Sequence, residues 1–115
     1  KRLVIIYLSD HGEKPGWTRL EEKIDYQMFR IPCLIYFSPD IRNSNIYSIL
    51  KENSKKYWSN DLLFELTYNL LGIHNENILD SSKDISSPNY SLTINDFSLV
   101  SGKYLVKDDP YNVKQ

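Results

Sequence analysis

Two apolar runs near the start of the chain predict β-strands. The first covers residues 3–8 and the second 31–37, and both are rich in β-branched and aromatic residues. Nearly continuous runs are typical of strands that are buried on both faces of a parallel sheet, whereas half-exposed strands alternate. We therefore expect two central strands of a mostly parallel sheet. Because a central strand needs a neighbour on each side, we also expect further strands of this sheet to precede residue 1.

Helical spacing appears after the second run. Ile46, Ile49 and Leu50 recur at the helical period, and the charged stretch 51–56 is expected to end this helix in solvent. The spacing also allows a short helix over 20–29, between the two strands. Ser38-Pro39-Asp40 can initiate the helix that contains Ile46.

A second helix is predicted over 61–71. Its apolar face consists of Leu62, Leu63, Leu66, Leu70 and Leu71. Ser59, Asn60 or Asp61 can cap its first amides. Gly72 stands where a left-handed residue commonly ends a helix.

The pattern of polar and apolar residues changes in the last third of the chain. Residues 75–89 are mostly polar and predict a long surface loop. Residues 97–100 and 104–106 predict a hairpin around the glycine-containing turn 101–103. With the strands and helices before it, this pattern indicates an α/β class.

Composition narrows the function more by exclusion than by indication. The 115 residues carry 14 Lys+Arg against 15 Asp+Glu, for a net charge of −1, so the basic excess of a dedicated nucleic-acid binder is missing. No apolar run approaches the roughly 20 residues that span a bilayer. A single cysteine, Cys33, rules out an internal disulfide and a multi-cysteine zinc site. Within its strand we expect Cys33 to act as a small buried apolar group.

The candidate chemistry directly follows the first strand. Asp10 and His11 offer an oxygen and a nitrogen ligand from one turn, a mixture that suits zinc or manganese. Gly12 lets the backbone pass close by. The same pair is also consistent with an aspartate that caps a turn and a histidine on the surface. Two ligands are too few for a catalytic zinc, so further ligands would have to come from upstream sequence.

Four segments, in order, resemble a known family. Ile6–Glu13 is similar to the strand and metal-binding loop of the sulfatase-like phosphoethanolamine transferases, members of the alkaline-phosphatase superfamily. Three later segments resemble that family's next core strand, its S-H-D-N-L-F…L-L-G-I helix and its S-S-P-x-Y element, namely Met28–Ser38, Trp58–Ile73 and Ser86–Tyr90. Together they cover most of residues 3–106.

The resemblance implies a fold and a location. Residues 1–115 would be a single-domain fragment, the C-terminal part of an alkaline-phosphatase-like three-layer sandwich. Such a fragment has a few mostly parallel strands, flanking helices and a C-terminal hairpin. Upstream sequence would supply transmembrane helices and the nucleophile, with the catalytic domain on the periplasmic side of a bacterial inner membrane.

The resemblance also implies a reaction. In the family, a threonine takes phosphoethanolamine from phosphatidylethanolamine as a covalent phospho-enzyme and passes it to lipid A, lipopolysaccharide core or a similar surface glycan. Asp10 and His11 would ligate a divalent metal, zinc or alternatively manganese, and Glu13 would orient a ligand without binding the metal itself. No catalytic residue lies in this stretch, which alone would be inactive, and no substrate-binding residue is identified.

One departure from the family pattern stands out. A Gly-His pair commonly follows the Asp-His-Gly-Glu motif, but Gly16-Trp17 occupies that place here. No histidine lies between His11 and His74, and we expect His74 to be exposed or to cap a helix. Thr18 and Arg19 are alternative phosphate contacts, although the favoured interpretation of Arg19 is a solvated loop residue.

Three hypotheses therefore stay open. Besides the phosphoethanolamine transferase, a sulfatase or phosphoglycerol transferase of the same superfamily would share the Asp-His pair, and its upstream nucleophile would distinguish it. A divergent binding domain without catalysis is the third. In each case we expect no nucleic-acid partner, and we expect the chain by itself to self-associate through an exposed apolar sheet edge or face.

Overall fold

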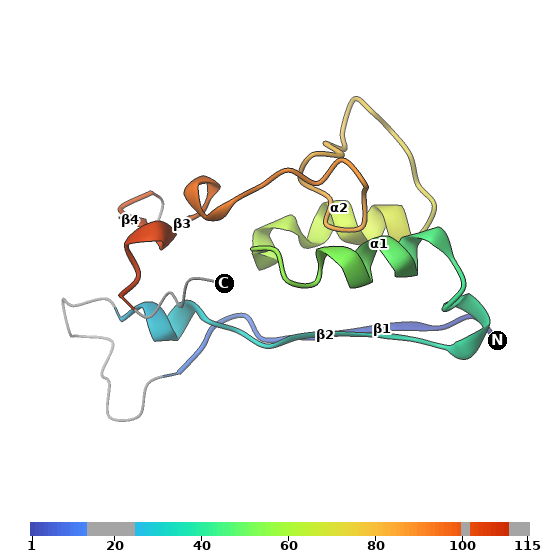
Figure 1. The fold of residues 1–115 in the computed structure, drawn as a ribbon, viewed down its shortest axis with the longest axis horizontal. Helices are drawn as coiled ribbons and strands as arrows, with labels where there is room; N and C mark the ends of the chain where they lie inside the picture. The colour runs from blue at the N-terminus through green and yellow to red at the C-terminus, as the bar shows by residue number, and fades with distance from the viewer. Residues whose placement is uncertain (14–24, 100–101, 111–115) are drawn as a thin grey trace. The chain divides into compact units, whose positions relative to one another are not determined.

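The computed structural model describes residues 1–13, 25–99 and 102–110. In these ranges two helices and four strands follow one another, linked by short 3₁₀ turns (Figure 1): β1 (Val4–Leu8), β2 (Cys33–Phe37), α1 (Asn45–Asn53), α2 (Leu63–Leu70), β3 (Ser98–Leu99) and β4 (Tyr104–Leu105). The predicted α/β class is thus confirmed. The short helix expected over 20–29 has its first residues outside the described ranges, and the rest forms a 3₁₀ turn, η1 (Tyr26–Phe29).

The chain divides into two compact units. Unit 1 comprises Lys1–Ile5 and Tyr36–Thr93, and it holds both α-helices. Unit 2 comprises Ile6–Ile35 and Ile94–Gln115, and it holds η1 and the C-terminal hairpin.

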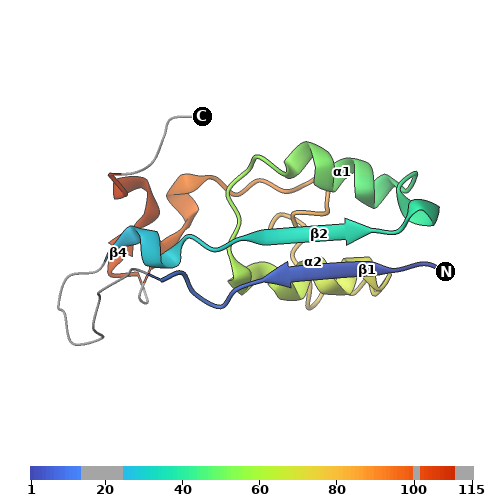
Figure 2. The ribbon, with the colours of Figure 1, turned by 90° about the horizontal axis from the view of Figure 1, so that it is seen from below.

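β1 and β2 form a two-stranded sheet in which the strands run in opposite directions (Figure 2). The expectation of mostly parallel strands is therefore wrong for the described residues. In unit 1 the amide of Ser38, just after β2, donates to the carbonyl of Leu3, just before β1, at 2.9 Å. A parallel pair needs a crossover, usually a helix, that carries the chain back to the starting edge. The described part of the connection contains a single 3₁₀ turn instead.

Burial on both faces of the sheet was also expected, and it is not observed. Side-chain exposure alternates along β1, so that Ile5 and Tyr7 are 50% and 60% exposed while their neighbours are partly covered. In β2 only Phe37 is buried, and its ring meets Tyr47 of α1 edge-on at 5.4 Å in unit 1. Cys33 is exposed rather than buried, although partial desolvation still raises the pKa of its thiol. A continuous apolar run thus identified the strands but not how many faces are covered.

Serine caps and a C-terminal glycine mark the helices of unit 1, although α1 begins at Asn45 and not at Ser38-Pro39-Asp40, where the chain forms a 3₁₀ turn, Pro39–Ile41. The hydroxyl of Ser44 accepts a hydrogen bond from the amide of Tyr47 and starts α1. Ser59 likewise caps a 3₁₀ turn, Asn60–Leu62, that leads into α2. At the other end of α2, Gly72 has φ +71° in the left-handed region, as predicted.

The predicted apolar face of the second helix is only partly correct. Leu66 is fully buried and forms the centre of the unit 1 core. Leu71, by contrast, is 67% exposed because the helix ends at Leu70 and the chain turns away there. The prediction extended the helical face one residue beyond the helix.

The polar segment after α2 is not a simple surface loop. Asp84, Ile85, Ser86, Ser87 and Tyr90 are all buried, in contrast to the prediction for 75–89. Asn69 of α2 donates from Nδ2 to Asp84 Oδ2 at 2.7 Å and to Ser86 Oγ at 2.8 Å. Buried polar groups are stable when they are hydrogen-bonded, and α2 supplies the donors that the sequence of the loop does not reveal.

The predicted C-terminal hairpin is confirmed in unit 2. β3 and β4 pair antiparallel, with Ser98 opposite Leu105 and Leu99 opposite Tyr104. Gly102, at the turn, has φ +89°, which glycine adopts without steric cost. Residues 100–101 of the turn lie outside the described ranges.

Candidate functional site

Asp10 and His11 lie in the turn that follows β1, in unit 2, and local hydrogen bonds define its shape. The hydroxyl of Ser9 donates to the carbonyl of His11 at 2.7 Å, and the amide of His11 donates to Asp10 Oδ1 at 3.1 Å. The two side chains are 87% and 61% exposed. The aspartate therefore does cap the turn, as the alternative interpretation held, and both side chains are accessible from solvent.

One ring nitrogen of His11 is engaged by the backbone. Nδ1 lies 2.7 Å from the carbonyl oxygen of Gly12. Because a carbonyl can only accept, this hydrogen bond requires the proton on Nδ1. In the neutral imidazole, Nε2 then carries the lone pair that a metal would bind.

The free nitrogen and the carboxylate are close to a metal-binding spacing. Nε2 of His11 lies 3.8 Å from Asp10 Oδ1. Two donors bound at about 2.1 Å to a tetrahedral metal lie about 3.4 Å apart, so a small side-chain adjustment would let both atoms bind one ion. The pair therefore fits two positions of a divalent metal centre.

The remaining ligands are not found nearby. Over residues 1–13, 25–99 and 102–110, no three His, Cys, Asp or Glu side chains come together as a metal site. Glu13 is exposed and makes no hydrogen bond to another described residue, so its predicted orienting role stays a prediction. The group that contacts His11 Nδ1 is instead the Gly12 carbonyl, which the sequence analysis did not identify.

Gly12 is held in a tight backbone environment. Its amide donates to the carbonyl of Met28 at 2.6 Å, next to η1. A Cβ atom at this position would lie 2.7 Å from the carbonyl oxygen of Gln27 and 2.9 Å from those of Met28 and Arg30. These distances leave no room for a side chain, so this turn requires glycine for close packing rather than for a positive φ.

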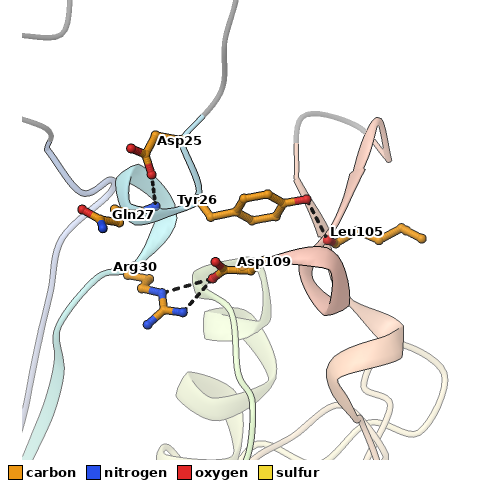
Figure 3. Close-up of polar contacts among 6 residues, drawn as sticks. All are labelled: Asp25, Tyr26, Gln27, Arg30, Leu105 and Asp109. Atoms are coloured by element: carbon orange, nitrogen blue, oxygen red, sulfur yellow. Dashed lines mark hydrogen bonds and ion pairs between the residues drawn. The ribbon is translucent and has the colours of Figure 1, made fainter. Parts of the chain in front are cut away.

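η1 and Arg30, the residue after it, are in turn bound to β4 and to Asp109, which follows the 3₁₀ turn Val106–Asp108 after the hairpin (Figure 3). Arg30 donates from Nε and Nη2 to Asp109 Oδ2, at 3.2 and 2.7 Å. The hydroxyl of Tyr26 donates to the carbonyl of Leu105 at 3.2 Å. Desolvation, with the charges of Asp108 and Asp109 adding to it, raises the pKa of Tyr26, so this hydroxyl stays protonated and can donate.

The other predicted residues belong to unit 1 or lie outside the described ranges. His74 is exposed, as expected. Gly16, Trp17, Thr18 and Arg19 belong to a segment that the structure does not describe.

Comparison with protein-family models, curated proteins and solved structures yields no match. Among the residues that the structure describes, no helix has both the length and the apolar character that crossing a membrane requires.

Proposed function

We propose that this chain is the C-terminal part of the catalytic domain of a metal-dependent phosphoethanolamine transferase. The observation that carries the proposal is the Asp10–His11 pair, with Nε2 available 3.8 Å from a carboxylate oxygen at the end of β1. The order of the four family-like segments supports it further. The parent enzyme would move phosphoethanolamine from phosphatidylethanolamine to lipid A, lipopolysaccharide core or a similar glycan at the periplasmic face of the inner membrane.

Asp10 and His11 would hold a divalent metal, for which zinc is the best match to an oxygen and nitrogen donor set. Such an ion, when bound, stabilises negative charge on a phosphoryl oxygen and lowers the pKa of a bound hydroxyl. His11 contributes a neutral imidazole whose proton stays on Nδ1, bound to the Gly12 carbonyl. Asp10 contributes the negative charge that favours a cation at this exposed turn. The threonine nucleophile and the other ligands would come from other sequence.

The test uses the full-length protein in phosphatidylethanolamine vesicles with lipid A as acceptor. Zinc content is measured by elemental mass spectrometry, and transfer by the mass gained by the acceptor. Asp10→Asn and His11→Ala should each lose zinc and at least 100-fold in transfer rate. His74→Ala, which removes the other histidine at an exposed position, is the matched control and should behave as wild type.

Three results would contradict the proposal. Full zinc content in both variants would remove Asp10 and His11 from the metal site. A wild-type protein that binds zinc but hydrolyses aryl sulfates, without forming a phospho-threonine, would favour the sulfatase alternative. A zinc-free wild type with no transfer would favour the non-catalytic binding domain.

A further inference from the structure

We infer that Asp109 and Arg30 are positioning residues for His11, acting through η1 and Gly12 to keep the imidazole proton on Nδ1 and Nε2 free for a metal. All of these residues belong to unit 2. The inference rests on the proposed function for the identity of the ligand, but its central claim concerns the protonated nitrogen of His11 and can be tested without metal.

The first step is the ion pair between Arg30 and Asp109. The carboxylate of Asp109 is 4% exposed, whereas Arg30 is half exposed. Two nitrogens of one guanidinium contact the same carboxylate oxygen, which fixes the direction of the arginine side chain (Figure 3). A buried carboxylate is costly without its cation, so this contact holds the backbone at residue 30 against the end of the hairpin.

The second step leads from η1 to Gly12. The carbonyl oxygens of Gln27, Met28 and Arg30 lie within 3 Å of the place that a Gly12 Cβ would occupy, on one side of its α-carbon, and the Met28 carbonyl also accepts the Gly12 amide hydrogen. The hydrogen bond fixes the peptide group between His11 and Gly12, and the close carbonyls restrict rotation of the following peptide group, which carries the Gly12 carbonyl. The position of η1 therefore sets the direction of the Gly12 carbonyl.

The third step leads from Gly12 to the imidazole. The Gly12 carbonyl oxygen lies 2.7 Å from His11 Nδ1, and this contact decides which nitrogen carries the proton. Mutation of a group that is hydrogen-bonded to a metal-binding histidine commonly changes metal affinity about 10–100-fold. If η1 is released, the carbonyl is free to turn away and the exposed ring can move its proton to Nε2.

The main experiment reads the proton directly. The chain contains two histidines, so two-bond ¹H–¹⁵N spectra of the metal-free, ¹⁵N-histidine-labelled chain give two sets of signals, and exposed His74 is an internal reference. Wild-type His11 should show the Nδ1–H form at a pH where the ring is neutral. Asp109→Asn should shift His11 toward the Nε2–H form and leave His74 unchanged. Asp108→Asn, at the exposed neighbouring carboxylate, is the matched control and should leave both histidines unchanged.

Two further variants separate positioning from mere stabilisation. Arg30→Lys keeps the charge, and the resulting partial contact should give an intermediate shift. Tyr26→Phe removes the hydrogen bond from η1 to the Leu105 carbonyl and should also shift the His11 proton toward Nε2. If Asp109→Asn does not fold, as its amide spectrum would show, these two variants carry the test. An Nε2–H wild type, or folded variants that all keep the wild-type ratio, would overturn the inference.

Zinc retention by the same variants in the full-length protein distinguishes this inference from the proposed function. We expect Asp109→Asn to bind zinc at least tenfold more weakly than wild type. Zinc that depends on His11 but is retained fully in Asp109→Asn would overturn the positioning role and leave the proposed function intact. If the His11 proton shifts in Asp109→Asn but the wild-type protein never binds zinc, the positioning role is supported and the proposed function is contradicted.

Discussion

Asn53, the last residue of α1, makes the most informative contact between the helices and the polar segment of unit 1. Its side chain is 4% exposed, and its Nδ2 donates to the carbonyls of Ile85 and Ser87, at 2.8 and 3.2 Å. Both acceptors belong to buried residues. Asn53→Ala removes the two donors and leaves two buried carbonyls without these partners.

The expected loss follows from these two bonds. A hydrogen bond contributes about 0.5–1.5 kcal/mol net, and a buried group left without its partner costs about 1–3 kcal/mol. Because rearrangement of the segment would let water reach some of the freed groups, we expect a loss of about 2–4 kcal/mol in the free energy of unfolding. Asn53→Asp, which keeps the size but replaces the donor with an acceptor, should lose at least as much. That comparison separates the lost donors from the cavity that alanine leaves.

The assay is urea unfolding followed by circular dichroism. With a slope of about 2 kcal/mol per molar urea, the loss corresponds to a midpoint shift of roughly 1–2 M. Asn45→Ala, an exposed asparagine on the same helix, is the control and should stay within about 0.5 kcal/mol of wild type. If Asn53→Ala has the same urea midpoint as this control, and amide exchange in residues 84–90 is unchanged, the burial of this segment does not depend on Asn53. That result would refute the reasoning.

Three other predictions follow from single contacts. Gly12→Ala places a methyl group within 3 Å of three backbone oxygens, so thermal unfolding should show that the free energy of unfolding falls by about 1–3 kcal/mol or more. An unchanged melting temperature would contradict this close packing. Hydrogen bonds from the Ser82 hydroxyl and amide hold the pKa of Asp80 below its ordinary value of 3.8. The stabilisation that they give is therefore present above pH 3.8 and is lost as the pH falls through the lowered pKa. Ser82→Ala should raise the pKa of Asp80 in an NMR titration, and an unchanged titration midpoint would refute this cause. The chain should self-associate because Ile5 and Tyr7 of β1 are exposed. Light scattering should report a mass that rises with protein concentration, and the rise should be smaller in Tyr7→Ser. A strict monomer would count against this prediction.

Much of the local structure was predictable from the sequence. The cap at Ser59 and the left-handed glycine after α2 depend on neighbours within a few residues, and they lie where their chemistry predicts. The C-terminal hairpin likewise follows from a glycine between two short apolar segments. The adjacency of Asp10 and His11 is a property of the sequence itself, so the candidate metal ligands needed no fold to be found.

The contacts that give these elements their setting were not predictable in this way. The direction of β2 against β1 depends on the path of the connection, and the uncovered face of β1 depends on what the rest of the chain packs against it. Burial of the polar segment required donors from Asn53 and Asn69, which lie on two different helices.

The same division holds for the candidate site. The sequence supplied two metal-binding side chains, but the tertiary structure decided which imidazole nitrogen is free, through the Gly12 carbonyl and the turn packed against it. That turn is held by an ion pair between Arg30 and Asp109, which are 79 residues apart. Short-range patterns record the preferences of a residue and its neighbours, whereas such a pair forms only when folding brings a buried carboxylate to a cation that stabilises it.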